Sequence, residues 1–202
     1  FYEVTHQSAF RSVTIGADNT VYMMESDEQL HSVSQIDGTQ NWTFAVGSGA
    51  YMGNHVIGPD TQQYVAYYDV PTETPHLVAF DQDKAINWDK PGYMRCLGFS
   101  AFGDALAINT SQELVALDPV SGDVVWHTLI NHTLSTSCAL ANDGTIYLEA
   151  GQSSGFDGEV MAFDSLGGFK WAIPSTGQIY RPPMLYADGR LYVPNHESAY
   201  NP

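Results

Sequence analysis

Four aspartates recur at one position of a repeated phrase, and a pair of carboxylates can perform the acid and base steps of glycoside hydrolysis. Each aspartate stands three residues after an aliphatic residue and four residues before a tyrosine. The four are Asp18, Asp60, Asp143 and Asp188. A position that is repeated in every copy is usually structural, so we interpret these aspartates as turn residues that cap their own backbone. Hydrolytic carboxylates are the alternative.

Cysteine and histidine are the other residues that could do chemistry. Cys96 and Cys138 lie 42 residues apart, so they form neither a CxxC redox motif nor a zinc motif. We expect either two buried thiols or a disulfide between neighbouring repeats, because disulfide geometry leaves both open. His127 and His132 are five residues apart, which is not a familiar metal-ligand spacing. The sequence has no GxSxG nucleophile turn.

The aspartate phrase belongs to a longer unit with a period of roughly 40–45 residues. Its second half alternates apolar and polar residues, turns at Asp or Gly, and closes on a tryptophan, as in LVALDPVSGDVVW (114–126). All four tryptophans of the chain close this half: Trp42, Trp88, Trp126 and Trp171. A degenerate copy of the aspartate phrase occupies residues 99–108. A period of this length, written in short strands and turns, is typical of β-propeller blades.

The predicted fold class is therefore all-β, a β-propeller of four-stranded blades in one domain over residues 1–202. In each repeat the first strand precedes the aspartate turn, the second carries the tyrosine, and the fourth ends in tryptophan. The blades are expected at residues 11–46, 54–90, 94–130, 136–175, and 180–202 together with 1–8.

The phrase LVALDPVSGDVVW resembles the PQQ-like repeat of quinoprotein-type β-propellers, and the resemblance covers almost the whole chain. The second copy departs from the pattern, since Lys84 or Ala85 replaces the turn glycine. The first copy departs as well, with Ser34-Gln35-Ile36 where the A-x-D part belongs. In that family the tryptophan packs against the neighbouring blade. The resemblance implies the same blade-packing role for Phe1, Trp42, Trp88, Trp126 and Trp171.

The two ends of the chain match different parts of the repeat. Residues 1–11 overlay residues 171–181, which places Phe1 in a tryptophan position, and residues 197–202 overlay residues 113–119. We therefore expect the N-terminal strand to pair with the C-terminal blade and close a ring of five blades, which removes exposed sheet edges. The alternative is a fragment of a longer propeller, since the relatives that the resemblance implies have seven or eight blades.

The cofactor site of the quinoprotein dehydrogenases does not match this sequence. Those relatives use adjacent cysteines, a stacked tryptophan and a calcium site of Glu, Asn and Asp, whereas Cys96 and Cys138 are far apart in the chain. We expect no cofactor, no metal site and no enzymatic activity. Relatives without the cofactor site serve as protein-assembly scaffolds, for example the lipoproteins of outer-membrane-protein assembly.

The charge of the chain excludes some partners. The net charge is −16, from 23 acidic and 7 basic residues, so no basic surface exists to neutralise nucleic-acid phosphates or to bind anionic membranes. No run of apolar residues approaches the roughly 18 that a membrane-inserted helix needs. Three N-glycosylation acceptors, Asn41, Asn109 and Asn131, favour a secreted or cell-surface location.

The sequence thus favours a non-catalytic binding or structural scaffold outside the cytoplasm. We expect a protein partner or self-assembly, because propellers present loops of every blade around one axis. The alternative is a carbohydrate-active protein, a lectin or a glycosidase, since repeated similar surfaces suit multivalent glycan binding.

Overall fold

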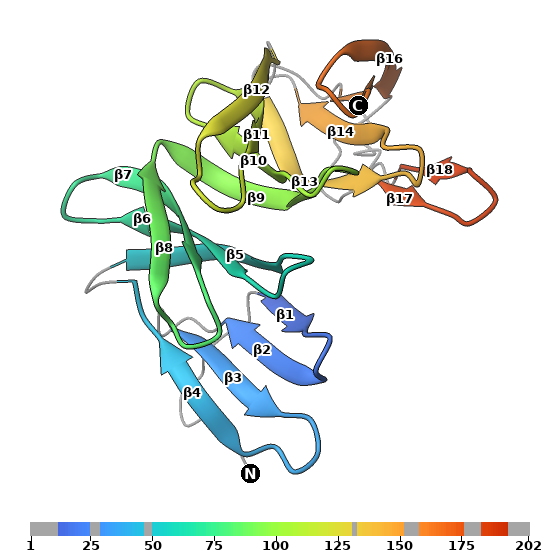
Figure 1. Cartoon of the computed structure of the whole chain (residues 1–202). Helices are drawn as coiled ribbons and strands as arrows, with labels where there is room; N and C mark the ends of the chain where they lie inside the picture. The colour runs from blue at the N-terminus through green and yellow to red at the C-terminus, as the bar shows by residue number, and fades with distance from the viewer. Residues whose placement is uncertain are drawn as a thin grey trace, which may run out of the picture. The chain divides into compact units, whose positions relative to one another are not determined.

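The structure is a computed structural model that describes residues 12–24, 29–46, 50–130, 133–151, 158–175 and 183–193. All the regular secondary structure in these described residues is β-strand (Figure 1). Four antiparallel sheets of four strands follow one another along the chain, and a two-stranded sheet comes last. The predicted all-β class with four-stranded sheets is confirmed.

The strand bounds follow the repeat. The first sheet has β1 (Ser12–Ile15), β2 (Thr20–Met24), β3 (Leu30–Ser34) and β4 (Gln40–Phe44). The second has β5 (Ala50–Ile57), β6 (Gln63–Asp69), β7 (Thr74–Phe80) and β8 (Ile86–Pro91). The third has β9 (Tyr93–Phe99), β10 (Ala105–Asn109), β11 (Glu113–Leu117) and β12 (Val124–Leu129). The fourth has β13 (Thr133–Leu140), β14 (Ile146–Gly151), β15 (Gly158–Phe163) and β16 (Phe169–Ser175). The last has β17 (Met184–Leu185) and β18 (Leu191–Tyr192).

Strands that are adjacent in sequence are adjacent in each sheet, so short turns connect them. Because the strands are antiparallel, the turn between the first and second strands lies at the same end of the sheet as the turn between the third and fourth strands. We call this end of a sheet its paired-turn end. The repeat therefore brings its aspartate turn and the turn before its tryptophan strand to one end of every complete sheet.

The chain divides into two compact units. The first unit comprises residues 1–96 together with 119–122, and the second comprises residues 97–118 together with 123–202. Phe1 and the end segments 1–8 and 194–202 lie outside the described residues. The single domain, the number of blades and the closure of the ring therefore remain predictions.

A row of three paired residues crosses the middle of each complete sheet and explains which residue types recur in the repeat. It has a large residue on the second strand, a small one on the third and tryptophan on the fourth. The rows are Tyr22-Ser32-Trp42, Tyr64-Ala79-Trp88, Leu106-Ala116-Trp126 and Tyr147-Ala162-Trp171. The small residue leaves room for the tyrosine and tryptophan rings to meet, with centroids 5.7–5.8 Å apart. Ring pairs at this distance stabilise beyond their buried area.

The register corrects one detail of the sequence interpretation. A β-bulge follows the small residue in all four sheets, after Ser32, Ala79, Ala116 and Ala162. The first copy therefore carries Ser32-Val33-Ser34 at the A-x-D position, and the assignment of Ser34-Gln35-Ile36 was wrong. Ser34 takes the aspartate position, because its amide donates to the Thr39 carbonyl as the Asp118 amide does to the Asp123 carbonyl.

The four repeated aspartates are turn residues, as predicted. Each carboxylate accepts the backbone amide of the residue two positions later, at 2.9–3.1 Å. These N–H groups stabilise the ionised form, so the backbone amide of Thr20 lowers the pKa of Asp18, and that of Thr145 lowers the pKa of Asp143. In the degenerate third copy Ser100 does the same, since its Oγ accepts the amides of Phe102 and Asp104.

Candidate functional site

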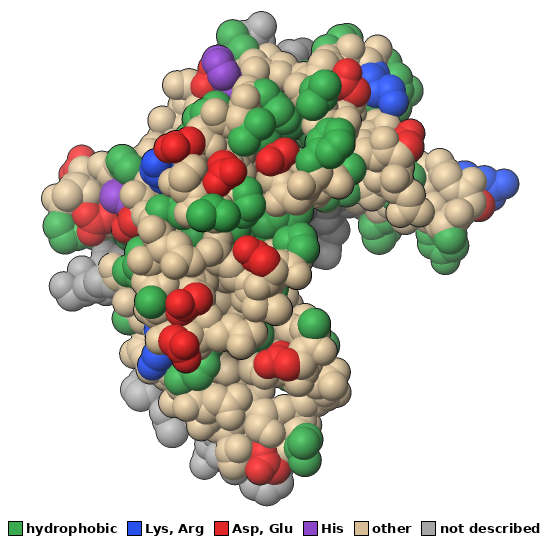
Figure 2. Space-filling view, viewed as in Figure 1, with side chains coloured by type: hydrophobic (Ala, Val, Ile, Leu, Met, Phe, Trp, Pro, Cys, Tyr) green, Lys and Arg blue, Asp and Glu red, His purple; other side chains and the backbone are tan. Residues whose placement is uncertain are grey.

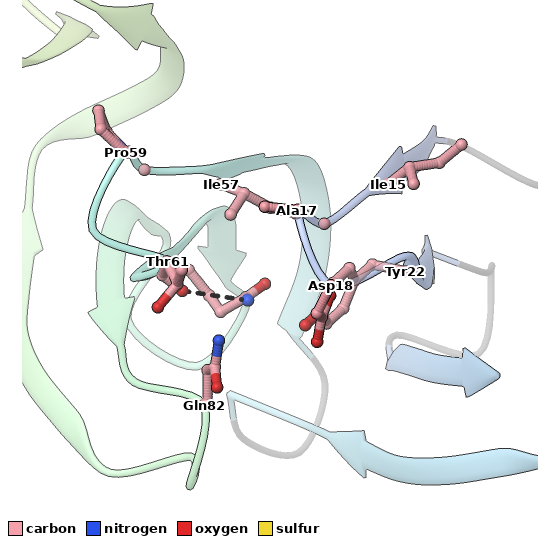
Figure 3. A pocket seen from close by; sticks show the side chains of 11 residues that line it. Ile15, Ala17, Asp18, Tyr22, Ile57, Pro59, Thr61 and Gln82 are labelled. Atoms are coloured by element: carbon pink, nitrogen blue, oxygen red, sulfur yellow. Dashed lines mark hydrogen bonds between the residues drawn. The ribbon is translucent and has the colours of Figure 1, made fainter. Parts of the chain in front are cut away.

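A pocket of about 390 Å³ lies in the first unit, where the β1–β2 turn meets the β5–β6 turn (Figure 3). It lies at the paired-turn ends of the first two sheets, and one residue of the β7–β8 turn also lines it. The lining residues are Ile15, Gly16, Ala17, Asp18, Tyr22, Ile57, Gly58, Pro59, Thr61, Gln63 and Gln82. A pocket of this size with a few polar groups is a candidate binding site.

Polar side chains converge on the pocket from three turns. Figure 3 shows the Asp18 carboxylate and the Gln82 amide pointing into the same space, with Thr61 beside them. Ile15 and Pro59 lie at its margins in the same view. Asp18 is solvent-exposed, and its lowered pKa keeps it ionised at neutral pH. The site therefore combines one negative charge, amide groups and apolar walls.

A buried polar network lies beside this pocket. Nε2 of His55 is 2.6 Å from Oε1 of Gln63, so the imidazole donates and the amide oxygen accepts. Nε2 of Gln63 donates to the Thr61 carbonyl at 3.4 Å, and the ring centroid of Tyr22 lies 5.3 Å from that of His55. Gln63 and Tyr22 both line the pocket. The network thus connects the pocket to the contact between β2 and β5.

Both new residues of this network break the pattern of the repeat. At the position of Gln63 the other copies have Val21, Ala105, Ile146 and Leu191. At the position of His55 they have Val13, Leu97 and Cys138. Sequence reasoning missed the pair, although aligning the copies would have revealed a glutamine and a histidine where every other copy is apolar. Departures from a local rule are expected at functional sites.

His55 gives the protein an acid sensitivity that can be measured. Burial lowers the pKa of His55 to about 4, and the hydrogen bond to Gln63 opposes this only in part. An unfolded histidine titrates near 6.5, so the unfolded chain binds more protons between pH 6.5 and 4 and stability falls as the pH falls through this window. We expect the wild type to lose about 2 kcal/mol between pH 7 and pH 5 through His55. Urea unfolding of wild type and His55→Gln at both pH values measures the difference.

The matched control for this prediction is His127→Gln. The His127 side chain is mostly exposed and lies outside the buried network, so the loss that comes from His55 should persist in this variant. If His55→Gln does not fold, a titration of the His55 ring by NMR in the wild type answers the same question. A ring that titrates near pH 6.5 would contradict the prediction.

A second pocket lies at the equivalent place in the second unit. It has a volume of about 570 Å³ and is formed by the β13–β14 and β17–β18 turns. Asp143 and Tyr147 stand there where Asp18 and Tyr22 stand in the first pocket. Leu191 takes the sequence position of Gln63. The hollow between neighbouring aspartate turns is thus a feature of the repeat, and the polar network is specific to the first pocket.

A histidine and a carboxylate meet in the second and third sheets, in an arrangement that also occurs in catalytic triads. Nδ1 of His76 is 2.8 Å from Oδ1 of Asp89, and Nδ1 of His127 is 3.0 Å from Oε1 of Glu113. His76 and Glu113 occupy the same position of the repeat, as do Asp89 and His127. Acid and base are therefore exchanged between two copies of one pair, which favours a structural role as a link between the third and fourth strands.

Three of the four predicted blade-packing tryptophans, Trp42, Trp88 and Trp126, meet a turn of the following sheet. In the first unit Trp88 donates from Nε1 to the Pro119 carbonyl at 3.0 Å, and Gly122 lies against its ring. In the second unit Gly167 lies against the ring of Trp126. Lys84, at the same turn position, stands over the ring of Trp42 at 5.9 Å, a cation–π contact. Trp171 contacts Tyr147 of its own sheet.

The remaining predicted sites are the two cysteines and the three glycosylation acceptors. Cys96 and Cys138 are not joined by a disulfide in the structure, and burial raises the pKa of Cys138 to about 12. Asn41 is exposed, whereas the Asn109 amide donates to Glu113 at 2.6 Å, and Asn131 lies outside the described residues. No group of three or more metal-ligating side chains occurs in the described part of the chain. Among those residues no helix is long and apolar enough to cross a membrane.

The fold is similar to solved β-propellers. A protein of unknown function from Bacteroides caccae superimposes with a TM-score of 0.68 at 14% identity, covering 98% of this chain and 74% of that one. BamB from Moraxella catarrhalis superimposes with a TM-score of 0.66 at 18% sequence identity, and the match covers 91% of this chain. The Dos1 propeller superimposes with a TM-score of 0.66 at 13% sequence identity, and that match covers 93% of this chain. The chain spans 53% of the length of each of these two. No protein-family model matches the sequence, and no curated protein sequence does. The chain thus has a fold of the β-propeller type.

Proposed function

We propose that this chain is a non-catalytic scaffold that binds a protein partner outside the cytoplasm. The propeller-type fold supports this, and the PQQ-like phrase without its cofactor residues supports it further. BamB and the Dos1 propeller are neighbours in fold, and the assembly role that the family resemblance implies is carried over as part of the proposal. The exposed glycosylation acceptor Asn41 supports the location.

One observation carries the proposal: apolar side chains stand in solvent at the same turn position of three sheets. Ile36, Val120 and Leu166 each lie two residues after the residue that opens the turn between the third and fourth strands. Their exposed fractions are 97%, 78% and 66%, so these side chains contribute little to the packing of the core. Single exposed apolar residues are common on protein surfaces, so it is their recurrence at one turn position of three sheets that supports a contact role.

The charge of the molecule defines the partner further. Acidic side chains are scattered over the face that Figure 2 shows, in line with the net charge of −16. A protein surface with apolar residues flanked by basic ones would complement these turns, since opposite charge steers association and suppresses wrong partners. We therefore propose a basic partner surface with apolar contacts.

A photo-crosslinking experiment tests the proposal. A photoreactive amino acid at Ile36, Val120 or Leu166 should crosslink one partner in the cells that produce the protein, to be identified by mass spectrometry. The purified partner should bind the triple variant Ile36→Ser/Val120→Ser/Leu166→Ser at least about tenfold more weakly than wild type, as loss of apolar anchors predicts. Sedimentation of the chain alone detects self-assembly as the other outcome.

The matched control uses three apolar residues that are also exposed, although less so, and that lie on fourth strands. Ile86, Val124 and Phe169 stand two residues before their tryptophans and are each more than half exposed. Their triple serine variant should bind the partner as wild type does. Equal weakening by both triple variants would contradict a docking role for the turns.

A lectin is the second candidate, because the amide and hydroxyl groups of the 390 Å³ pocket can also hydrogen-bond a sugar. A glycosidase fits less well, since the four repeated aspartates are engaged as turn caps. A glycan array and a generic glycosidase assay distinguish these from the scaffold. A clear hit on either would overturn the proposal.

A further inference from the structure

We propose that the pocket between the β1–β2 and β5–β6 turns takes an arginine side chain of the partner protein. This inference rests on the proposed function and names the chemistry that one contact of the partner would have. The arguments come from the charge of the pocket, from its division into polar and apolar parts, and from the network beside it.

The charge of the pocket selects a cation. Asp18 is ionised at neutral pH because the backbone N–H of Thr20 stabilises its carboxylate. None of the eleven lining residues is basic, so nothing would neutralise a phosphate or carboxylate ligand. The net charge of −16 adds a field of the same sign. A cationic group is therefore attracted and an anionic one is repelled.

The distribution of polar and apolar groups matches arginine in particular. A guanidinium carries five N–H donors in a planar fork and no acceptor, so it needs acceptors from more than one direction. The Asp18 carboxylate, the Gln82 side-chain amide and the Thr61 hydroxyl come from three different turns and include such acceptors (Figure 3). Ile15, Ala17, Ile57 and Pro59 provide apolar surface for the methylene stem.

The buried network singles this pocket out from its counterpart in the second unit. His55 and Gln63 are both buried, and they introduce polar groups where the other copies are apolar. Nδ1 of His55 has no hydrogen-bond partner among the described atoms, although its side chain is almost wholly buried. Such groups destabilise a fold, so their retention at one pocket needs a reason besides packing. His55 and the Thr61 carbonyl together fix the Gln63 amide beside Thr61, one of the polar residues of the pocket.

An NMR titration of the isotope-labelled whole chain tests the proposal. The probes are N-acetyl-arginine-methylamide and its citrulline counterpart, which has nearly the same shape but no charge. The arginine probe should shift the side-chain amide signals of Gln63 and Gln82 in a saturable way, and added salt should weaken binding. The citrulline probe should bind about tenfold more weakly, as loss of a charge-assisted hydrogen bond predicts.

Two aspartate variants separate the pocket from the turn. Asp18→Asn should weaken the arginine probe about tenfold. Asp60→Asn is the matched control, because Asp60 makes the same turn hydrogen bond in the next copy but does not line the pocket. It should leave binding unchanged.

Several results would overturn the inference. Equal binding of both probes, equal loss in both aspartate variants, or binding of neutral sugars without binding of arginine would each do so. The first two results do not bear on the crosslinking from the turn residues, so a failure of the pocket is distinguishable from a failure of the scaffold function. A partner that crosslinks while the arginine probe does not bind would reject the pocket alone.

Discussion

Replacing Trp88 by alanine is expected to destabilise the protein by about 3–5 kcal/mol, as truncation of a buried ring does. Trp88 is 7% exposed, and its ring lies between Tyr64 of its own sheet and the β11–β12 turn. The variant loses the buried area and also leaves the Pro119 carbonyl without this donor. Urea unfolding followed by far-UV circular dichroism measures the change, since the variant removes a fluorescent probe.

Two further variants divide this effect into its parts. Trp88→Phe keeps a ring but loses the indole N–H, and we expect about 1–2 kcal/mol from the hydrogen bond and the smaller area. Ile86→Ala lies on the same strand and is more than half exposed, so it should change stability by no more than about 0.5 kcal/mol. If Trp88→Ala unfolds at the same urea concentration as wild type, the tryptophan does not hold the turn of the next sheet.

Gly122→Ala is expected to destabilise the protein by about 2–4 kcal/mol, although it adds a single methyl group. Two causes add. The backbone of Gly122 has a φ of +70°, which an L-residue adopts at a cost of roughly 1 kcal/mol. A Cβ atom there would lie 2.7 Å from Cδ2 of Trp88, and this rigid ring cannot move aside as the end of a flexible chain can. Thermal unfolding of the purified variant measures the sum.

Gly38→Ala isolates the packing part of that effect. Gly38 occupies the same turn position in the first sheet with the same φ of +70°, but a Cβ there would have no neighbour within 4 Å. It should destabilise by only about 1 kcal/mol, the cost of the backbone conformation. Equal effects of the two substitutions would show that Gly122 is needed for its conformation alone.

The repeat and its strands could be predicted from the sequence because the forces that set them are local. Alternation decides which side chains face inward, and Asp-x-Thr and Asp-Gly pairs favour turns through hydrogen bonds two residues away. Asp143, for example, binds the amide of Thr145 whatever lies around it. The tryptophan pattern then gave the period, and the period gave four strands per unit.

The alignment of the first copy failed for a reason that lies in pairing. The sequence offers two serines, and only the register of β3 against β4 decides that Ser32 stands opposite Trp42. The β-bulge after Ser32 lets the longer turn follow without shifting the faces of the strands. A bulge of this kind depends on the neighbouring strand, so a reading of one strand does not detect it.

The candidate site lay further beyond the sequence, because its parts come from different sheets. His55 and Gln63 are eight residues apart on opposite strands of one hairpin, whereas Asp18 and Tyr22 belong to the preceding sheet. The packing of β2 against β5 brings them together. The exchanged pairs of His76 with Asp89 and Glu113 with His127 were hidden in the same way, since pairing across strands defines them.

The sequence by itself determined the strands, the turns, the period and the all-β class, because each of these follows from residues within a few positions of one another. The tertiary structure alone decided which side chains meet between sheets. It placed Gly122 on Trp88, and it brought the His55–Gln63 pair to a pocket with Asp18. Contacts of this kind depend on how one apolar face covers the next, and a single repeat does not contain its neighbour.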